Sequence, residues 1–258
     1  MTTPPLYQPL GAREQAALLR TIIDRCAHAA TTSQRAVVVF DLDGTLLENR
    51  PRTLAILREF AENLRAKGEL APDANVAVER LLTAKAEELL YLIAHSLEHL
   101  GIKAKDLVDQ ASDYWKARFF VDEYLKHDTE VAGAASFARA CYEAGGNVVY
   151  FTGRDVPNMS LGSFKSLRDL GFPIGTPGTS LVCKPTFDMP DEQYKREVGP
   201  ELQRMGHVVA VFDNEPANCN NLLGLYEGAE SVFIDTQHLP GAPALDPRVH
   251  VVRDFVLG

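Results

Sequence analysis

Residues Ala36–Leu47 read AVVVFDLDGTLL. The unbroken run of valine and phenylalanine predicts a strand buried on both faces, as in a parallel sheet, and ligands bind at the carboxyl ends of such strands. Asp41 and Asp43 follow the run one residue apart, so both share one side of the pleat. Two carboxylates this close repel each other unless a cation or a shared proton relieves them, and Mg²⁺ prefers oxygen ligands. A metal-dependent site is therefore predicted at the end of this strand.

The composition is that of an ordinary globular protein. The chain has 258 residues, of which 46% are hydrophobic and 24% charged, enough for one sizeable domain or for a core with an accessory lobe. A net charge of −9 argues against a nucleic-acid-binding surface, which needs a basic face. Its four cysteines lack the CxxC spacing of a zinc site, which suits a reduced, cytoplasmic protein. We expect no signal sequence, no membrane span and a soluble, cytoplasmic protein.

Further apolar runs predict an α/β fold with a Rossmann-like parallel sheet. A helix is expected over residues 12–30, before the first strand, because apolar residues recur there at helical spacing. Helix-like segments separate the later strand-like runs, which is the pattern of parallel strands with helical crossovers. These runs are residues 147–152 (NVVYFT), 180–183 (SLVC), 207–212 (HVVAVF) and 231–234 (SVFI).

A long insertion separates the first two predicted strands, where a crossover needs only about a dozen residues. Its periodicity is helical, so we predict an all-helical cap domain over residues 48–129 and an α/β core from residues 1–47 and 130–258. The predicted helices of the cap cover residues 53–67, 75–100 and 104–126.

Polar residues follow three of the later strands, at the sheet end that carries the two aspartates. The second strand ends in Thr152, Gly153 and Arg154, which present a hydroxyl and a guanidinium. Lys184 follows the third strand and precedes a proline, which turns the chain there. Lys195 is a weaker alternative, since residues 191–198 have the pattern of a solvated helix.

The fourth strand ends in Asp213, Asn214 and Glu215. Asp213 is the natural additional metal ligand, because it too follows an apolar run at the same sheet edge. It also suits the N-cap of the helix that begins near residue 216. Which of Asn214 and Glu215 adds a second ligand from this loop stays open.

Taken in order, these four segments resemble the four motifs of the haloacid dehalogenase-like (HAD) superfamily in its phosphatase form. They are FDLDGTLL, FTGR, Lys184 and the DNEP that begins at Asp213, and the resemblance spans about residues 36–236. Asn214 departs from the commonest fourth motif, which carries a second acidic residue. The resemblance implies an HAD-like core with a cap, Asp41 as nucleophile and Asp43 as acid and base. The remaining implied roles are catalysis by Thr152 and Lys184, substrate binding by these two with Gly153 and Arg154, and a Mg²⁺ site at Asp41, Asp43 and Asp213.

The implied function is that of a Mg²⁺-dependent phosphatase acting on a small phosphorylated metabolite through an aspartyl-phosphate. A cap inserted between the first two motifs usually covers a small closed site, which favours a small substrate. Three alternatives remain open: a phosphotransferase or phosphomutase, a nucleotide or polynucleotide-end phosphatase, and a non-catalytic phosphate-binding module. We make no prediction of the oligomeric state.

Overall fold

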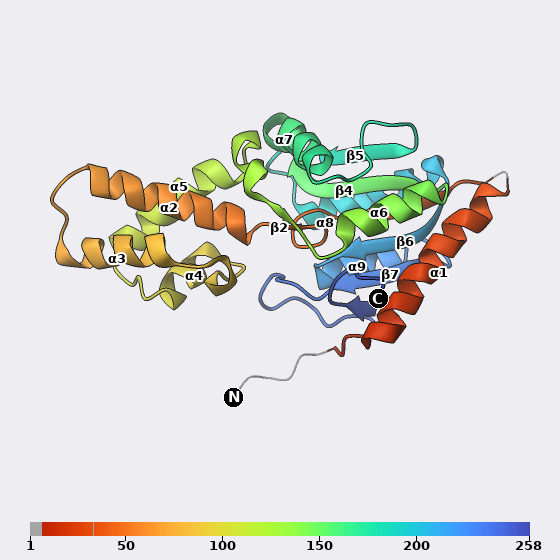
Figure 1. Ribbon diagram of the computed structural model, residues 1–258, viewed down its shortest axis with the longest axis horizontal. Helices are drawn as coiled ribbons and strands as arrows, with labels where there is room; N and C mark the ends of the chain where they lie inside the picture. The colour runs from red at the N-terminus through yellow and green to blue at the C-terminus, as the bar shows by residue number, and fades with distance from the viewer. Residues whose placement is uncertain (1–6, 33) are drawn as a thin grey trace.

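A computed structural model describes residues 7–32 and 34–258. Its centre is a sheet of six parallel strands (Figure 1). The chain order reverses on the two sides of the first strand, β1, which opens a crevice at the carboxyl ends of the strands. The α/β class and the parallel sheet predicted from the sequence are confirmed. In spatial order the strands are β5 (Thr179–Lys184), β4 (Asn147–Asp155), β1 (Ala36–Phe40), β6 (His207–Asp213), β7 (Glu230–Ile234) and β8 (His250–Val252).

The register of the sheet brings the two key aspartates to one edge. Phe40 of β1 is aligned with Tyr150 of β4 and with Phe212 of β6. The next residues along β1 and β6 are Asp41 and Asp213, so both carboxylates leave the sheet at the same level. All five residues of β1 are buried, as expected of a strand covered on both faces.

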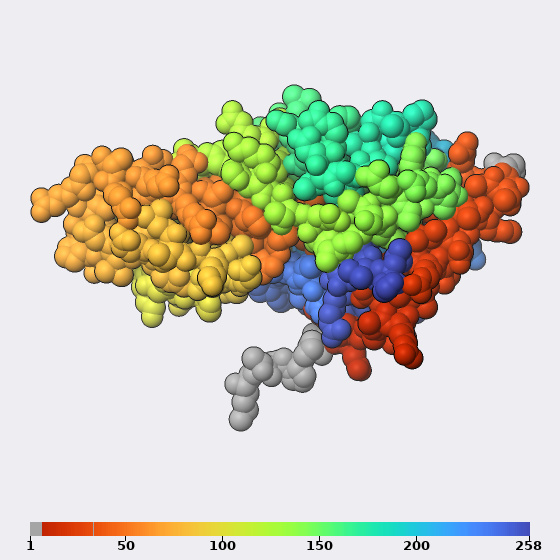
Figure 2. All heavy atoms as spheres, in the orientation of Figure 1, coloured from red at the N-terminus to blue at the C-terminus, as the bar shows by residue number. Residues whose placement is uncertain are grey.

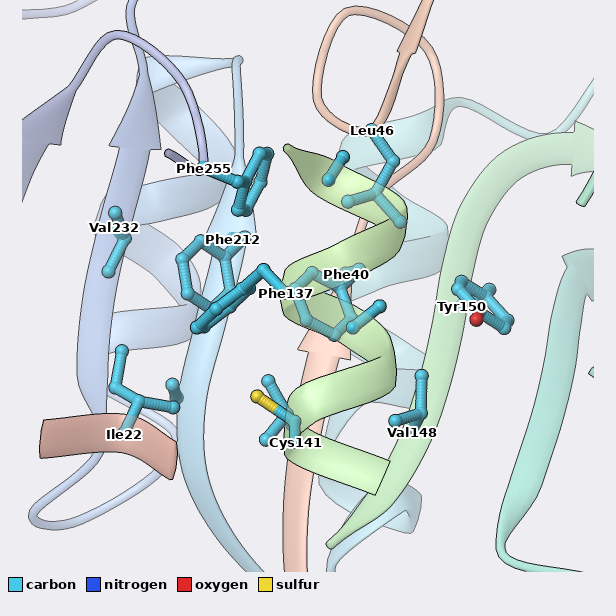
Figure 3. Close-up of a cluster of buried hydrophobic side chains, with 14 of the residues drawn as sticks. Ile22, Phe40, Leu46, Phe137, Cys141, Val148, Tyr150, Phe212, Val232 and Phe255 are labelled. Atoms are coloured by element: carbon cyan, nitrogen blue, oxygen red, sulfur yellow. The ribbon is translucent and has the colours of Figure 1, made fainter. Parts of the chain in front are cut away.

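Helices pack on both faces of the sheet. A core of aromatic rings lies on one face, where Phe40 stacks on Phe212 with 4.9 Å between ring centroids and Phe137 meets Phe40 edge-on (Figure 3). This packing fixes β1 and β6, the strands that carry Asp41 and Asp213. The helices on this face are α1 (Ala12–Ala30), α6 (Ala134–Glu143) and α7 (Val156–Asp169), and α8 (Asp191–Val198) and α9 (Pro216–Leu223) cover the other.

A helical insertion, residues 50–127, projects from one end of the core as a separate lobe (Figure 2). A two-stranded antiparallel ribbon joins it to the core, pairing β2 (Leu47–Glu48) with β3 (Thr129–Glu130). The insertion has an apolar core of its own, which includes Leu57, Phe60 and Leu81. Its helices are α2 (Arg50–Ala66), α3 (Pro72–Thr83), α4 (Ile93–His99) and α5 (Lys105–Phe119), with short 3₁₀ turns at η1 (Ala86–Glu88) and η2 (Asp122–His127).

Two of the helices predicted for the insertion are wrong in extent. Residues 75–100 form two helices, because Ser96 Oγ hydrogen-bonds both the backbone N–H and the carbonyl of Leu90, at 2.9 and 3.0 Å, and holds the intervening segment out of the helix. Gln237 of the core also donates to the Leu89 carbonyl, at 2.5 Å. The helix predicted over residues 104–126 ends at Phe119 and gives way to η2. No helix in the described part of the chain is long and apolar enough to cross a membrane.

Candidate active site

Asp41 and Asp213 share one ammonium group, that of Lys195. Lys195 Nζ lies 2.8 Å from Asp41 Oδ1 and 2.6 Å from Asp213 Oδ2, and all three side chains are buried. Burial raises the pKa of Asp41 to about 7, against the opposing effect of Lys195 and with a further contribution from Asp213. Two carboxylates facing one ammonium leave the cluster with surplus negative charge, which makes it a natural place for a cation.

Lys195, the weaker alternative from the sequence, therefore contacts the two aspartates, and Lys184 does not. Lys184 ends β5, donates to Asp191 Oδ1 at 2.8 Å and lies outside the residues that line the cavity above the sheet. Because β4 separates β5 from β1, the end of β5 is displaced from the two carboxylates. The helix α8 returns over the sheet, where Tyr194 packs on Phe151 with 5.0 Å between ring centroids and sets the adjacent lysine against the strand ends.

The loop after β6 uses its polar side chains to hold its own shape. Asp213 Oδ1 accepts from the Glu215 backbone N–H at 2.8 Å, but the N-cap of α9 is Glu215, so the N-cap role predicted for Asp213 is wrong. Asn214 accepts from the Thr45 hydroxyl at 3.1 Å, which ties this loop to the one after β1. The Glu215 carboxylate accepts from the Leu239 backbone N–H at 3.2 Å. Neither Asn214 nor Glu215 joins Lys195 and the two aspartates.

Asp43 belongs to a second, separate charge cluster. Arg154 binds both of its oxygens, at 2.7 and 2.8 Å, and Arg52 binds Oδ1. Both guanidiniums also bind Asp128, whose side chain is fully buried, at 2.7 to 3.0 Å. Burial would raise the pKa of Asp43, but Arg154 and Arg52 outweigh it and hold that pKa well below its usual range. Asp43 is therefore a carboxylate in this arrangement.

Thr152 and Gly153 lie at the same sheet edge as predicted. The Thr152 hydroxyl accepts from the Arg154 backbone N–H at 3.2 Å, and both Thr152 and Gly153 line the cavity. A Cβ at position 153 would lie 2.2 Å from Asp191 Oδ2, so a larger residue there would displace the Asp191 side chain. Arg154 is almost fully buried, and its guanidinium binds the Asp43 carboxylate.

These residues form one end of a cavity of about 460 Å³ between the core and the helical insertion. The insertion supplies mainly apolar and aromatic side chains to the other walls. The polar residues at the sheet edge are Asp41, Asp43, Thr152, Lys195 and Asp213, and the insertion contributes Leu89, Tyr91, Ile93, Trp115, Phe119 and Phe120.

The oxygen atoms at this edge of the sheet suit a Mg²⁺ ion that is bound by both side-chain and backbone oxygens. Within residues 7–32 and 34–258 no three histidine, cysteine, aspartate or glutamate side chains converge as a ready-made metal site. Asp41 and Asp213 provide two hard carboxylates at the strand ends, and the implied third ligand is the backbone carbonyl of Asp43. Magnesium characteristically takes one or two carboxylates and completes its shell with other oxygens, so this set suits it.

Sequence reasoning missed Arg52 and Asp128 and ranked Lys195 too low. Arg52 and Asp128 flank the β2–β3 ribbon, one at each end of the insertion. Oppositely charged residues at these two junctions could have indicated an ion pair. The sequence carried no such pattern for Lys195, because the burial of Tyr194 and Lys195 in the otherwise polar helix α8 is a property of the folded chain.

Comparison with known proteins places the fold. A scan against protein-family models matched none, and no curated protein matched in sequence. Among solved structures, a "Putative Phosphatase" from Clostridium difficile superposes with a TM-score of 0.53 at 12% identity, over 86% of this chain and 96% of its own. The chain shares the fold of this protein.

Two proteins named as HAD hydrolases superpose less closely on this chain. One, from Entamoeba histolytica, has 14% identity and a TM-score of 0.47 over 85% of this chain and 93% of its own. The other, from Bacillus subtilis and described as bound to magnesium, has 13% identity and a TM-score of 0.46 over 86% and 96%.

Proposed function

We propose that this HAD-like protein is a Mg²⁺-dependent phosphatase that hydrolyses a small phosphorylated metabolite through an aspartyl-phosphate on Asp41. One observation carries the proposal: Asp41 and Asp213 meet on Lys195 at the polar end of a cavity, with Asp43 on the same loop as Asp41. A buried nucleophile, a paired carboxylate and a fixed cation are the elements that phosphoryl transfer needs.

Asp41, Asp213 and the Asp43 carbonyl would hold the Mg²⁺. When bound, the ion would offset the repulsion between the phosphate and the Asp41 carboxylate. Lys195 already supplies one positive charge to this pair of aspartates. Its ammonium also fixes Asp41 Oδ1 and so orients the carboxylate.

Asp41 Oδ2 is the oxygen available to attack phosphorus. It accepts only a long hydrogen bond of 3.3 Å, from the Thr45 hydroxyl, whereas Oδ1 is held by Lys195. In the first step a bond forms between Oδ2 and phosphorus while the bond from phosphorus to the ester oxygen breaks, and that oxygen takes a proton. In the second step water attacks phosphorus, which releases inorganic phosphate and restores the Asp41 carboxylate.

Asp43 would donate the proton in the first step and accept one from water in the second. Arg52 and Arg154 hold it as a carboxylate, which is the form needed for the second step. To donate a proton, Asp43 must first release at least one guanidinium. Movement of the helical insertion would achieve this, because Arg52 belongs to its first helix.

Release of inorganic phosphate from a panel of phosphorylated metabolites at neutral pH with Mg²⁺ tests the proposal. Wild type should release phosphate, and Asp41→Asn or excess EDTA should abolish the release. A panel that includes an alcohol acceptor separates hydrolysis from transfer, because a transferase would yield a new phosphate ester instead of free phosphate. Absence of both products across the panel would contradict the proposal.

A further inference from the structure

The helical insertion presents an aromatic surface to the cavity. Trp115, Phe119 and Phe120 at the end of α5 line it and are half-buried, outside the apolar core of the insertion. Trp115 lies 4.5 Å from Phe119 and 5.7 Å from Phe120 between ring centroids. Phe120 also packs on Phe187, at 5.1 Å between ring centroids, and Phe119 lies under the Arg52 guanidinium. Because all three rings remain partly exposed at the cavity wall, a further ring can reach them, and aromatic pairs favour stacked or edge-on contacts.

A continuous chain of contacts links this surface to the reacting end of the cavity. The Arg52 guanidinium carbon lies 4.1 Å from the centroid of the Phe119 ring, and Arg52 Nη1 donates to the Phe119 carbonyl at 3.0 Å. The same guanidinium binds Asp43. The aromatic surface thus begins one side chain away from the carboxylate that serves the ester oxygen.

Two polar side chains of this wall have partners within the protein, whereas the buried Nε of Arg50 has none in the described part of the chain. The Trp115 indole N–H donates to the Thr53 hydroxyl at 3.1 Å, and Arg50 is paired with Glu48. The extended segment between α3 and α4 adds Leu90 and Tyr91 to the cavity, each more than 40% exposed. An apolar group placed against this wall would lose water-exposed surface.

Building on the phosphatase function above, we propose that the substrate is a phosphate monoester whose organic group is a planar aromatic ring, packed against Trp115 and Phe119. The phosphate lies at Asp41 and Lys195, and the ring extends past Arg52 along α5. The Leu90 and Tyr91 side chains bound the same space.

Three esters of matched reactivity test the ring preference: benzyl phosphate, cyclohexylmethyl phosphate and glycerol 1-phosphate. In each the ester oxygen is attached to a CH₂ group, so leaving-group chemistry differs little and kcat/KM reports recognition. Wild type should prefer benzyl over cyclohexylmethyl phosphate by up to about tenfold, the range of an aromatic contact. Phe119→Leu should remove this preference, and Phe164→Leu, a residue of α7 that is 40% exposed and outside the cavity, should keep it.

Binding without turnover gives a second readout. The chain has one tryptophan, so quenching of its fluorescence reports directly on Trp115. Benzylphosphonate, which the enzyme cannot hydrolyse, should quench it more strongly than cyclohexylmethylphosphonate. A thermal melt checks the fold of each variant, and Phe120→Leu replaces Phe119→Leu if the latter unfolds.

The outcomes separate the two proposals. Phosphate release without preference for the benzyl ester, or with preference for glycerol 1-phosphate, would overturn the aromatic substrate and leave the phosphatase standing. Binding of benzylphosphonate without release from any ester would support the ring site and contradict the phosphatase. Neither binding nor release would overturn both.

Discussion

Arg52 and Arg154 bind the same carboxylate, that of Asp43, although one belongs to the helical insertion and the other to the core sheet. Asp128 binds both guanidiniums from the second junction of the insertion. Two arginines and two aspartates therefore balance one another at the point where both connections of the insertion meet the core. The state of Asp43 is consequently tied to the position of the insertion.

Asp128→Asn should strongly destabilise the protein. The substitution leaves two buried guanidiniums with one carboxylate, and removing one partner of a buried ion pair costs about 3–5 kcal/mol. Urea denaturation measures the resulting change in the free energy of unfolding. The matched control is Asp109→Asn, since Asp109 pairs with Lys105 in an exposed contact on α5. Asp109→Asn should change the free energy of unfolding by less than about 0.5 kcal/mol. Equal effects of the two substitutions would contradict the described network of ion pairs.

The two lysines should differ sharply in their effect on phosphate release. Lys195→Met removes the charge shared by Asp41 and Asp213, and losing such a preorganised group typically lowers kcat by about 10²–10³-fold. Lys184→Met removes only the pair with Asp191 and should change kcat less than about tenfold. Steady-state kinetics on one ester with saturating Mg²⁺ makes the comparison. A larger loss of kcat in the Lys184 variant would instead support Lys184 as the catalytic lysine.

Gly44→Ala should disturb the loop after β6 as well as its own turn. Gly44 has a φ of +78°, and its Cβ would lie 2.3 Å from Asn214 Nδ2, which donates to the Gln237 carbonyl. Gly241→Ala is the control, because Gly241 has a φ of +80° with open space around it and bears only the backbone cost of about 1–2 kcal/mol. Thermal unfolding should show a larger loss of stability for Gly44→Ala. Similar losses for the two variants would show that the Asn214 side chain moves aside at little cost.

Cys183 should react with thiol reagents slowly near neutral pH. All four cysteines lie in the described part of the chain, and Cys183 alone is not fully buried. Burial raises the pKa of its thiol to about 11, with Arg154 acting in the opposite direction. Because the thiolate is the reactive form, the rate should rise about tenfold per pH unit between pH 8 and 10. Iodoacetamide labelling of wild type and Cys183→Ser measures it; a plateau near pH 9 would contradict the raised pKa.

Five of the six core strands were predictable because each is a short apolar run ended by a polar residue, as in AVVVFDLD. Helix α6 and the three-residue strand β8 were not predicted, since a short alanine-rich stretch and the triplet His250–Val252 carry little periodicity of their own. The break between α3 and α4 depends on Ser96 and on Gln237 of the core. Contacts of this kind form only after folding, so local patterns do not reveal them.

The sequence indicated Asp41, Asp43, Thr152 and Asp213 because each lies within or just after the end of an apolar run, and these run ends share one edge of the sheet. Lys195 lies on a helix, where a solvated lysine and a buried one look alike in sequence. Its role depends on α8 packing against the sheet through Tyr194. The partners of Asp43 come from both junctions of the insertion and depend in the same way on tertiary structure.

Phosphate release by wild type and Asp41→Asn, measured side by side with and without Mg²⁺, tests the central claim most directly. We expect release only from wild type and only with Mg²⁺, with both proteins equally folded by circular dichroism. Release from Asp41→Asn at the wild-type rate would contradict the assignment of Asp41 as the nucleophile.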